Sequence, residues 1–458
     1  MDRTTVQQIF ETYKEVINGK SIEYFAARNW TKLPQSWRNH LENCTIEEVV
    51  ELVNDSSSSL LPLSLLSLKV IIRQQCYDRK PVESPEELWK IWSSSAFSVP
   101  FENTFKVISS EGVIRKKIKI KKQHEIDRIV ELVRQIQVFY QQKECEIDSL
   151  VDIGAGVGHL SRVIALHNKL AVMAVEGNDQ FTIAANSLDE KLITTTGQSL
   201  QTPTRFTTFV TEDLADKIDN FAENAAILVG LHTCGDFATT ILKVFEKSSK
   251  AKALILLGCC YHKEYQCFHF YQRENSSNEA LPSAVFPLSQ KWKNYELSYV
   301  FREMACHNNE NLMENARKQN IARYARAHLE RWIWEISEKS EDRNIGMSPV
   351  KCEEGKTTFE EYIRRAMAKR GANLVEDVIK KIAEKDPQLL STPVSSLPRK
   401  NFDKTDTVRM IFAPIIESTI IDDRLEYLRE KGIDAKAVPI FEPTISPRNI
   451  AIVANKLL

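Results

Sequence analysis

Between residues 148 and 262 the sequence alternates short apolar runs with longer segments that have the periodicity of helices. The apolar runs include SLVDI, LAVMAVE, AAILVGL and ALILLG, and segments such as HLSRVIALHN and FATTILKVFEKSS separate them. Strands that are apolar on both sides are typical of a parallel sheet with helices on both faces. The alternation therefore predicts an α/β fold built on a doubly covered parallel sheet.

Two more strand-like runs, DAKAVPIFEP and SPRNIAIVANK, close the chain and are joined by a turn that contains proline. With RFTTFVTED they bring the expected sheet to seven strands, the last two forming an antiparallel edge pair. A chain of 458 residues is too long for one ordinary core. The predicted parts are a helical N-terminal extension (1–114), a core (115–305), a helical insertion (306–403), and a helix with a strand pair that completes the sheet (404–458).

Composition limits the class of protein. The chain has 61 basic and 62 acidic residues, so any surface that binds nucleic acid must be local. Nine cysteines without CxxC spacing argue against a disulfide framework and a zinc ribbon. The first residues lack the basic start and apolar run of a signal peptide, and the longest apolar stretch (60–72) is too short for a membrane span. We therefore expect an intracellular protein, cytoplasmic or nuclear.

The segment VDIGAGVGHL, which follows the first predicted strand, carries a glycine-rich turn. Gly154, Gly156 and Gly158 give the spacing GxGxG, whereas a dinucleotide-binding turn would have glycine or alanine at His159. Asp152 precedes the turn at the carboxyl end of the strand. No GK[ST] sequence follows, so the turn is not a phosphate-binding loop of the P-loop kind. This pattern favours a nucleotide cofactor without pyrophosphate.

Two more carboxylates are expected at the same edge of the sheet. Glu176 ends the second strand, where a carboxylate can accept hydrogen bonds from both hydroxyls of a ribose. Asp213 ends the third predicted strand, where it is positioned for an adenine amino group. The predicted cofactor is S-adenosylmethionine, with its amino-acid end against the glycine backbone. The alternatives are a turn that only packs strand on helix and a Glu176 that is a solvated strand end. The expected cofactor-binding residues are Asp152, Gly154, Ala155, Gly156, Gly158, Glu176 and Asp213.

The sequence resembles the methyltransferase-like protein 25 group, some members of which are labelled ribosomal RNA adenine dimethylase domain-containing. The resemblance extends over most of residues 115–458, with LPQSWRNHLENCTIEEV (33–49) in addition. It implies the class I methyltransferase fold, with a seven-stranded Rossmann-like sheet. The segments that carry it are KKQHEI, VDIGAGVGHLSR, AVEGN, GLHTCGDFA, LLGCCYH, APIIESTIIDDRLEYLREKGI and ISPRNIAIVANK.

In such a sheet the loops after the fourth and fifth strands, GLHTCGD and GCCYH, face the methyl group. The first lacks the [ND]PP[YF] motif usual for amino-nitrogen methylation, so adenine N6 dimethylation is not expected. Cys234 and Cys260 occupy places comparable to those of the cysteines in pyrimidine C5 methyltransferases of RNA, without their DxPC and TC patterns. The pairing of HxCG with CCxH is similar to that of tRNA ribose methyltransferases, where His232 as base or Asp236 could take a hydroxyl proton. The candidate catalytic residues are His232, Cys234, Asp236 and Cys260.

Two alternatives to catalysis stay open for these loops. One is metal binding, because His232, Cys234, Cys259, Cys260 and His262 include soft metal ligands, but adjacent cysteines rarely chelate one zinc ion comfortably, and no metal is predicted. The other is packing, because buried cysteines behave as small apolar residues, and packing is the preferred interpretation of Cys259.

Basic segments offer candidate contacts with RNA. RKKIKIKK (115–122) could contact phosphates, although its alternation favours a half-buried strand. It precedes a helix that His124 and Glu125 open, where other class I enzymes close over the cofactor. A helix N-cap function for this segment is an equally natural interpretation. The helical insertion mixes cations with an aromatic ring, as RNA-binding surfaces do, but a solvated helix face would have the same composition. The residues concerned are Arg317, Arg323, Arg326, Arg331 and Trp332.

The function expected from these features is S-adenosylmethionine-dependent methylation of RNA, ribosomal or transfer. One alternative is methylation of a ribosomal or translation-related protein. Another is a non-catalytic interaction protein that binds the cofactor. The presence of Asp152 and Glu176 argues against this non-catalytic alternative, because a scaffold does not need ribose-binding carboxylates.

Overall fold

The structure is a computed structural model, and it divides the chain into two compact units. It describes residues 1–56, 60–82, 118–196, 201–263, 286–307, 309–317, 321–337 and 347–456. The sheet unit comprises Met1–Arg3, Gln75–His307 and Ile415–Leu458, and the helical unit comprises Thr4–Gln74 and Asn308–Pro414. Each unit is therefore assembled from segments that are distant in sequence.

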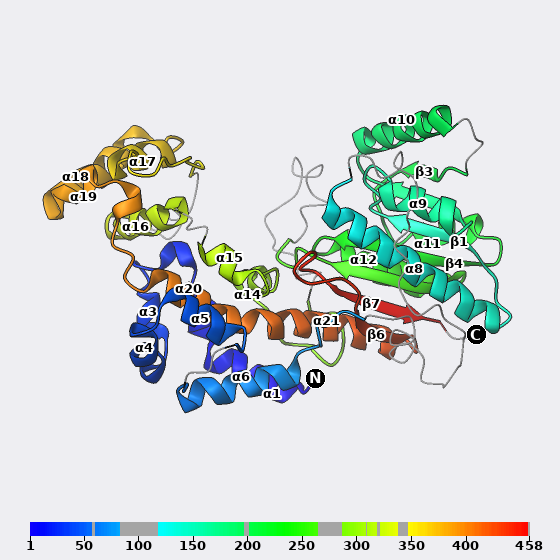
Figure 1. Cartoon of the computed structure of the whole chain (residues 1–458), viewed down its shortest axis with the longest axis horizontal. Helices are drawn as coiled ribbons and strands as arrows, with labels where there is room; N and C mark the ends of the chain where they lie inside the picture. The colour runs from blue at the N-terminus through cyan, green and yellow to red at the C-terminus, as the bar shows by residue number, and fades with distance from the viewer. Residues whose placement is uncertain are drawn as a thin grey trace. The chain divides into compact units, whose positions relative to one another are not determined.

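The sheet unit is built on seven strands in the order β3-β2-β1-β4-β5-β7-β6 (Figure 1). The first five strands are parallel, and β7 lies antiparallel between β5 and β6. The predicted seven-stranded α/β fold and its antiparallel pair are confirmed. The strands are β1 (Ile147–Ile153), β2 (Ala171–Glu176), β3 (Thr204–Thr207), β4 (Ala225–Thr233), β5 (Ala251–Gly258), β6 (Asp434–Pro439) and β7 (Ile450–Asn455).

Helices cover both faces of this sheet. One core joins α8 and α9 to side chains such as Leu150 and Val229, and the other joins α11, α12 and α21 to side chains such as Val151 and Leu228. Consecutive residues of one strand thus enter opposite cores, which accounts for the continuous apolar runs. The helices of the unit are α8 (Ile120–Gln142), α9 (His159–His167), α10 (Asp179–Thr196), α11 (Leu214–Phe221), α12 (Phe237–Lys247), α14 (Tyr299–Met304) and most of α21 (Ala413–Glu430).

Two sequence predictions about local structure are wrong. Within the basic segment, Ile120–Lys122 form the first turn of α8 rather than a strand, and residues 115–117 lie outside the described residues. The third strand ends at Thr207, so Asp213 lies at the start of α11 instead of at a strand end. Thr207 pairs with Glu176, the last residue of β2, and no further β2 residue remains to pair with a longer β3.

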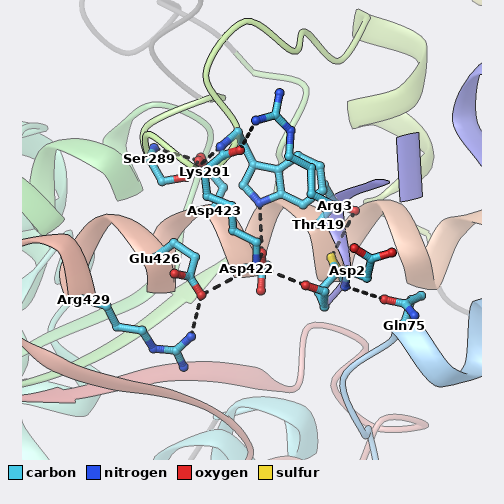
Figure 2. A network of polar contacts seen from close by, with 12 residues as sticks. Asp2, Arg3, Gln75, Ser289, Lys291, Thr419, Asp422, Asp423, Glu426 and Arg429 are labelled. Carbon is cyan, nitrogen blue, oxygen red and sulfur yellow. Dashed lines mark hydrogen bonds and ion pairs between the residues drawn. The ribbon is translucent and has the colours of Figure 1, made fainter. Parts of the chain in front are cut away.

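Carboxylates of α21 hold the segment that follows residue 285 (Figure 2). Asp422 Oδ2 accepts from the indole Nε1 of Trp292 at 2.9 Å and forms an ion pair with Lys291 Nζ at 2.8 Å. Asp423 accepts from the backbone amides of Leu288 and Ser289 at 2.8 Å each. These buried charges are therefore satisfied by several donors each.

The first residues of the chain join the same network (Figure 2). Lys291 Nζ donates to the Met1 carbonyl at 3.2 Å, and Arg3 Nη2 donates to the Lys293 carbonyl at 3.1 Å. The Asp2 amide donates to Gln75 Oε1 at 2.7 Å. Met1–Arg3 consequently belong to the sheet unit, although α1 continues into the helical unit.

The helical unit has its own core, which includes Tyr324, Leu329, Phe359 and Phe402. Thr45 is the N-cap of α5: its side chain accepts from the Glu48 amide, and the Glu48 side chain accepts from the Thr45 amide, a capping box. None of the described helices is long and apolar enough to cross a membrane. The helices are α1 (Arg3–Thr12), α2 (Lys14–Ile17), α3 (Asn29–Lys32), α4 (Gln35–Glu42), α5 (Ile46–Val53), α6 (Leu63–Gln75), α15 (Leu312–Arg317), α16 (Ile321–Ile336), α17 (Phe359–Ala366), α18 (Ala372–Lys385), α19 (Pro387–Ser391) and α20 (Phe402–Arg409).

Candidate functional site

The glycine turn connects β1 to α9 and lies at the carboxyl edge of the parallel strands. Gly154, Gly156 and Gly158 all have positive φ, between 56° and 79°, a conformation that side chains with a Cβ rarely adopt. The amides of Gly154 and Ala155 donate to the Val175 carbonyl, which fastens the turn to β2. A Cβ at Gly156 would meet nothing within 4 Å. The backbone there is open to a ligand.

Glu176 lies beside this turn, as the sequence predicts. Its Oε2 accepts from the Gly156 amide at 2.8 Å, and its Oε1 accepts from the Asn178 amide at 3.0 Å. Two backbone amides thus hold a half-buried carboxylate in place at the end of β2. A carboxylate in this position retains lone pairs for further donors.

Asp152 and Asp213 lie in different environments. Asp152 is buried at the end of β1 and accepts a hydrogen bond from Ser161 Oγ of α9. Burial raises the pKa of Asp152, and the Ser161 hydroxyl and the charge of Lys122 act in the opposite direction. Asp213 is exposed, and its nearest partner is the Thr211 hydroxyl at 3.4 Å. Asp152 thus joins the end of β1 to α9, and the predicted cofactor contacts of Asp152 and Asp213 stay predictions.

His232, the penultimate residue of β4, pairs with Glu125 of α8. Its Nε2 lies 2.8 Å from Glu125 Oε1. His232 has a φ of 62°, in the left-handed region, which for a residue other than glycine is a strained conformation found at functional sites. The sequence marks His232 as a catalytic candidate and Glu125 only as a residue near the start of a helix, and their pairing across 107 positions was not predicted.

Glu125 is nearly inaccessible, with 1% of its surface exposed. Ser446, in the loop between β6 and β7, donates to Glu125 Oε1 at 2.7 Å, and Lys121 and Lys122 approach it to 3.8 and 3.9 Å. Burial alone would raise the pKa of the Glu125 carboxyl, but the hydrogen bonds from His232 and Ser446 and the lysine charge hold it below its usual range. The carboxylate is thus ionised and orients the imidazole.

The neighbouring His124 has a structural role. Its Nε2 accepts from the Glu442 amide at 3.0 Å, which fastens the loop between β6 and β7 to the start of α8. Burial lowers the pKa of His124, so the ring is neutral and can accept this bond. The same loop carries Ser446, a residue that no sequence pattern marks.

Three cysteines from the two predicted loops converge. The Cys234 and Cys259 sulfurs are 3.1 Å apart, those of Cys259 and Cys260 are 3.6 Å apart, and all three lie within 4.8 Å of one another. The hydrogen bond from Cys259 lowers the pKa of Cys234 to about 6 and raises that of Cys259. The preferred interpretation of Cys259 as a packing residue is thus challenged, because its thiol faces two other thiols.

The other residues of these loops have different neighbours. Asp236 is buried at the N-terminus of α12, and its carbonyl accepts from the Thr239 hydroxyl at 2.7 Å. His262 Nδ1 contacts Cys306 Sγ at 3.3 Å. Of the soft ligands that the sequence offers, the structure therefore groups the three thiols, and His232 and His262 each have another partner.

Close packing of the loop backbones fixes this arrangement. Gly235 has a φ of 58°, and a Cβ there would lie 1.6 Å from the Lys263 carbonyl oxygen. The Cys259 amide donates to the Thr233 carbonyl at 3.4 Å. Only glycine permits this approach at position 235.

The arginines that the sequence suggests for RNA binding lie in the helical unit, and the three in α16 have acidic partners. Arg323 pairs with Asp406, Arg326 with Glu330 at 2.6 Å, and Arg331 with Glu335 at 3.7 Å. Arg331 also stacks on the Trp332 ring at 5.2 Å, and Arg317 ends α15. These ion pairs favour the interpretation of a charged helix face.

Comparisons with known proteins find the following similarities. Residues 121–266 match the model of a methyltransferase domain. The chain is 29% identical over 312 residues to probable methyltransferase-like protein 25 of Homo sapiens, a match that covers 64% of this chain and 48% of that protein. The Mus musculus protein of the same name is 29% identical over 264 residues, covering 55% and 40%. The matched region thus spans about half the length of these relatives. A solved S-adenosylmethionine-dependent methyltransferase from Clostridium acetobutylicum aligns with a TM-score of 0.20 and 19% identity, over 34% of this chain and 56% of that one.

Proposed function

The chain carries a methyltransferase domain and is related to methyltransferase-like protein 25, and on this premise we propose that it transfers the methyl group of S-adenosylmethionine to RNA. The proposal of methyl transfer rests on the hydrogen bond between His232 and Glu125. This pair lies at the same carboxyl edge of the sheet as the glycine turn. Ribosomal and transfer RNA are the expected substrates.

Cofactor binding is assigned to the turn and the carboxylates around it. Glu176 would accept from the ribose hydroxyls, and the backbone of Gly154, Ala155, Gly156 and Gly158 would lie along the amino-acid end. The open space over Gly156 and the fixed Glu176 carboxylate support this fit. When bound, S-adenosylmethionine supplies an electrophilic methyl group on a sulfonium.

His232 is the proposed general base. Because Nε2 faces Glu125, Nδ1 is the nitrogen that would take the proton of an acceptor hydroxyl or amine. Loss of that proton would leave the acceptor atom with the lone pair that takes up the methyl group, and the cofactor would leave as a neutral sulfide. The buried Glu125 carboxylate stabilises the imidazolium that results, and Ser446 holds that carboxylate in place.

Lysines at the start of α8 support RNA as the acceptor. Lys121 is exposed and Lys122 is half-buried, and both lie within about one turn of Glu125. The exposed Lys119 is the N-cap of the same helix. Positive charge beside the proposed base suits an acceptor that carries phosphates. The ion-paired arginines of α16 supply less support, because carboxylates of their own unit neutralise them.

The test uses the full chain, methyl-labelled S-adenosylmethionine and extract from cells that lack this protein. Half of each reaction is digested with ribonuclease and half with protease. Label released by ribonuclease, and lost with His232→Ala, supports the proposal. Label released only by protease shows a protein acceptor. Cofactor binding without any label shows the non-catalytic alternative.

A further inference from the structure

The three converging thiols have the spacing of a metal site. In tetrahedral zinc sites the Zn–S distance is about 2.3 Å, which places two sulfurs about 3.8 Å apart. The sulfurs of Cys259 and Cys260 are 3.6 Å apart, and those of Cys234 and Cys259 are 3.1 Å apart. Little movement is therefore needed for all three to bind one ion.

The backbone that carries these thiols is held in place without a metal. Thr233 Oγ1 donates to the Leu257 carbonyl at 3.1 Å, which joins the ends of β4 and β5. Gly235 lies against the Lys263 carbonyl so closely that no Cβ fits between them. Because the backbone around the thiols is already fixed, binding an ion costs less conformational entropy.

A buried cation lies next to the thiols. Arg424 of α21 is 1% exposed, and its guanidinium packs so closely on Gly258 that a Cβ there would lie 2.5 Å from Nη1. It stacks on Tyr261 at 5.2 Å, and its Nε has no hydrogen-bond partner among the residues that the structure describes. Its Nη2 donates to the Gly235 carbonyl at 3.5 Å, and the charge of Asp423 compensates its own in part. Further negative charge at the thiols would also be stabilised by this buried cation.

We propose that Cys234, Cys259 and Cys260 bind one Zn²⁺ ion as three thiolates, with the fourth position open. Binding displaces the protons that the thiols still carry, and the complex of Zn²⁺ with three thiolates has a net charge of −1. The buried guanidinium of Arg424 would stabilise that negative charge. Three protein ligands with one open position is the arrangement of reactive rather than purely structural zinc. The site is argued from this chain's residues alone and stands whichever acceptor the protein methylates.

The test is metal binding by the full chain in the presence of a phosphine reductant. Protein stripped with a chelator is titrated with Zn²⁺ against a chromophoric chelator, and separately with Co²⁺. We expect one Zn²⁺ per chain and, with Co²⁺, the absorption of a tetrahedral site with thiolate-to-cobalt charge transfer. Cys259→Ser should weaken binding about 100-fold or more, since even loss of an outer hydrogen-bond partner costs 10–100-fold. Cys145→Ser, a half-buried cysteine of the same unit, should bind as the unsubstituted chain does.

A second measurement does not depend on the folding of a variant. The unsubstituted chain is alkylated with and without Zn²⁺, and the labelled cysteines are identified by peptide mapping. Protection by Zn²⁺ confined to Cys234, Cys259 and Cys260 supports the site. Equal alkylation in both samples overturns it, as does equal zinc affinity in a folded Cys259→Ser chain. If air oxidises Cys234 and Cys259 to a disulfide once the reductant is removed, and the reduced chain binds no zinc, the two cysteines are a redox pair instead.

Discussion

Glu125 and His232 are 107 positions apart in the sequence, and their side chains meet with Glu125 Oε1 2.8 Å from His232 Nε2. Glu125→Gln keeps the shape of the side chain but removes the charge that stabilises a protonated imidazole. We expect the turnover number to fall by about 10²-fold, within the range that general base catalysis contributes. Cofactor affinity should stay the same, which calorimetry checks. Glu131→Gln, in the same helix and similarly buried, is the matched control. Unchanged turnover in Glu125→Gln would exclude the pair from catalysis.

Glu176→Ala tests the cofactor assignment. It removes an acceptor held by the Gly156 and Asn178 amides, and hydrogen bonds to a charged group contribute about 1.5–3 kcal/mol. The affinity for S-adenosylmethionine should therefore fall by about 10- to 100-fold. Asp179→Ala, an exposed carboxylate three residues further along, should bind the cofactor normally. Equal affinity in the two variants would show that the ribose lies elsewhere.

Lys119→Glu tests the positive charge at the start of α8. If phosphates bind there, the substitution should raise KM for RNA by about tenfold and reduce its dependence on salt, with little change in kcat. Lys217→Glu changes the charge of the chain equally from an exposed position on α11. Should both variants lose the same RNA affinity, the start of α8 has no specific role in binding RNA.

Gly235→Ala tests the packing of the two loops. Gly235 and Gly432 both have positive φ. A Cβ at position 235 would lie 1.6 Å from the Lys263 carbonyl oxygen, whereas a Cβ at position 432 would meet nothing within 4 Å. Gly432→Ala should cost about 1 kcal/mol of the free energy of unfolding, the penalty of a left-handed backbone. Gly235→Ala should cost about 3 kcal/mol or more, because the loops must also separate. Urea unfolding measures both, and equal losses would refute the close packing.

Asp219 gives a dependence of stability on pH. Partial burial would raise its pKa, but hydrogen bonds from Ser248, Ser249 and the Lys250 amide lower it from 3.8 to about 2. A depressed pKa in the folded state stabilises the protein above the unfolded value of 3.8, and this contribution is lost as the pH falls towards about 2. After screening by water, Asp219→Asn should cost about 1 kcal/mol at neutral pH.

Unfolding of the Asp219→Asn variant and the unsubstituted chain is compared from about pH 7 to about pH 3. The difference in stability should shrink below about pH 4. Asp216→Asn, an exposed residue of the same helix, is the control. A difference that grows as the pH falls would contradict the assignment.

Local patterns predicted the sheet and the glycine turn because both depend on neighbouring residues. The alternation of apolar runs with helical segments identified the strands. The contact of Glu176 with the glycine turn was predictable because β1 and β2 are neighbouring strands. Asp213 was misplaced because the apolar pattern continues past Thr207, where β2 has already ended. Local propensity alone cannot reveal where a partner strand ends.

The rest of the site depends on contacts across long stretches of sequence. Glu125, His232 and Ser446 come from α8, β4 and the loop before β7. The thiols converge only because β4 and β5 pair, and Arg424 reaches them from a helix that follows the insertion. The helical unit likewise combines residues before 75 with residues after 307. No periodic pattern within a single segment predicts such long-range contacts.

The position of β7 has a consequence for synthesis on the ribosome. This strand, which begins at Ile450, is the only neighbour of β5 on the side away from β4 among the described strands. A nascent chain therefore carries β5 with an open, strongly apolar edge until the last strand emerges from the exit tunnel. A premature stop codon in the helical insertion would release a chain in that condition permanently. We expect such truncated chains to aggregate or be degraded, even though every residue proposed to touch the cofactor has already been made.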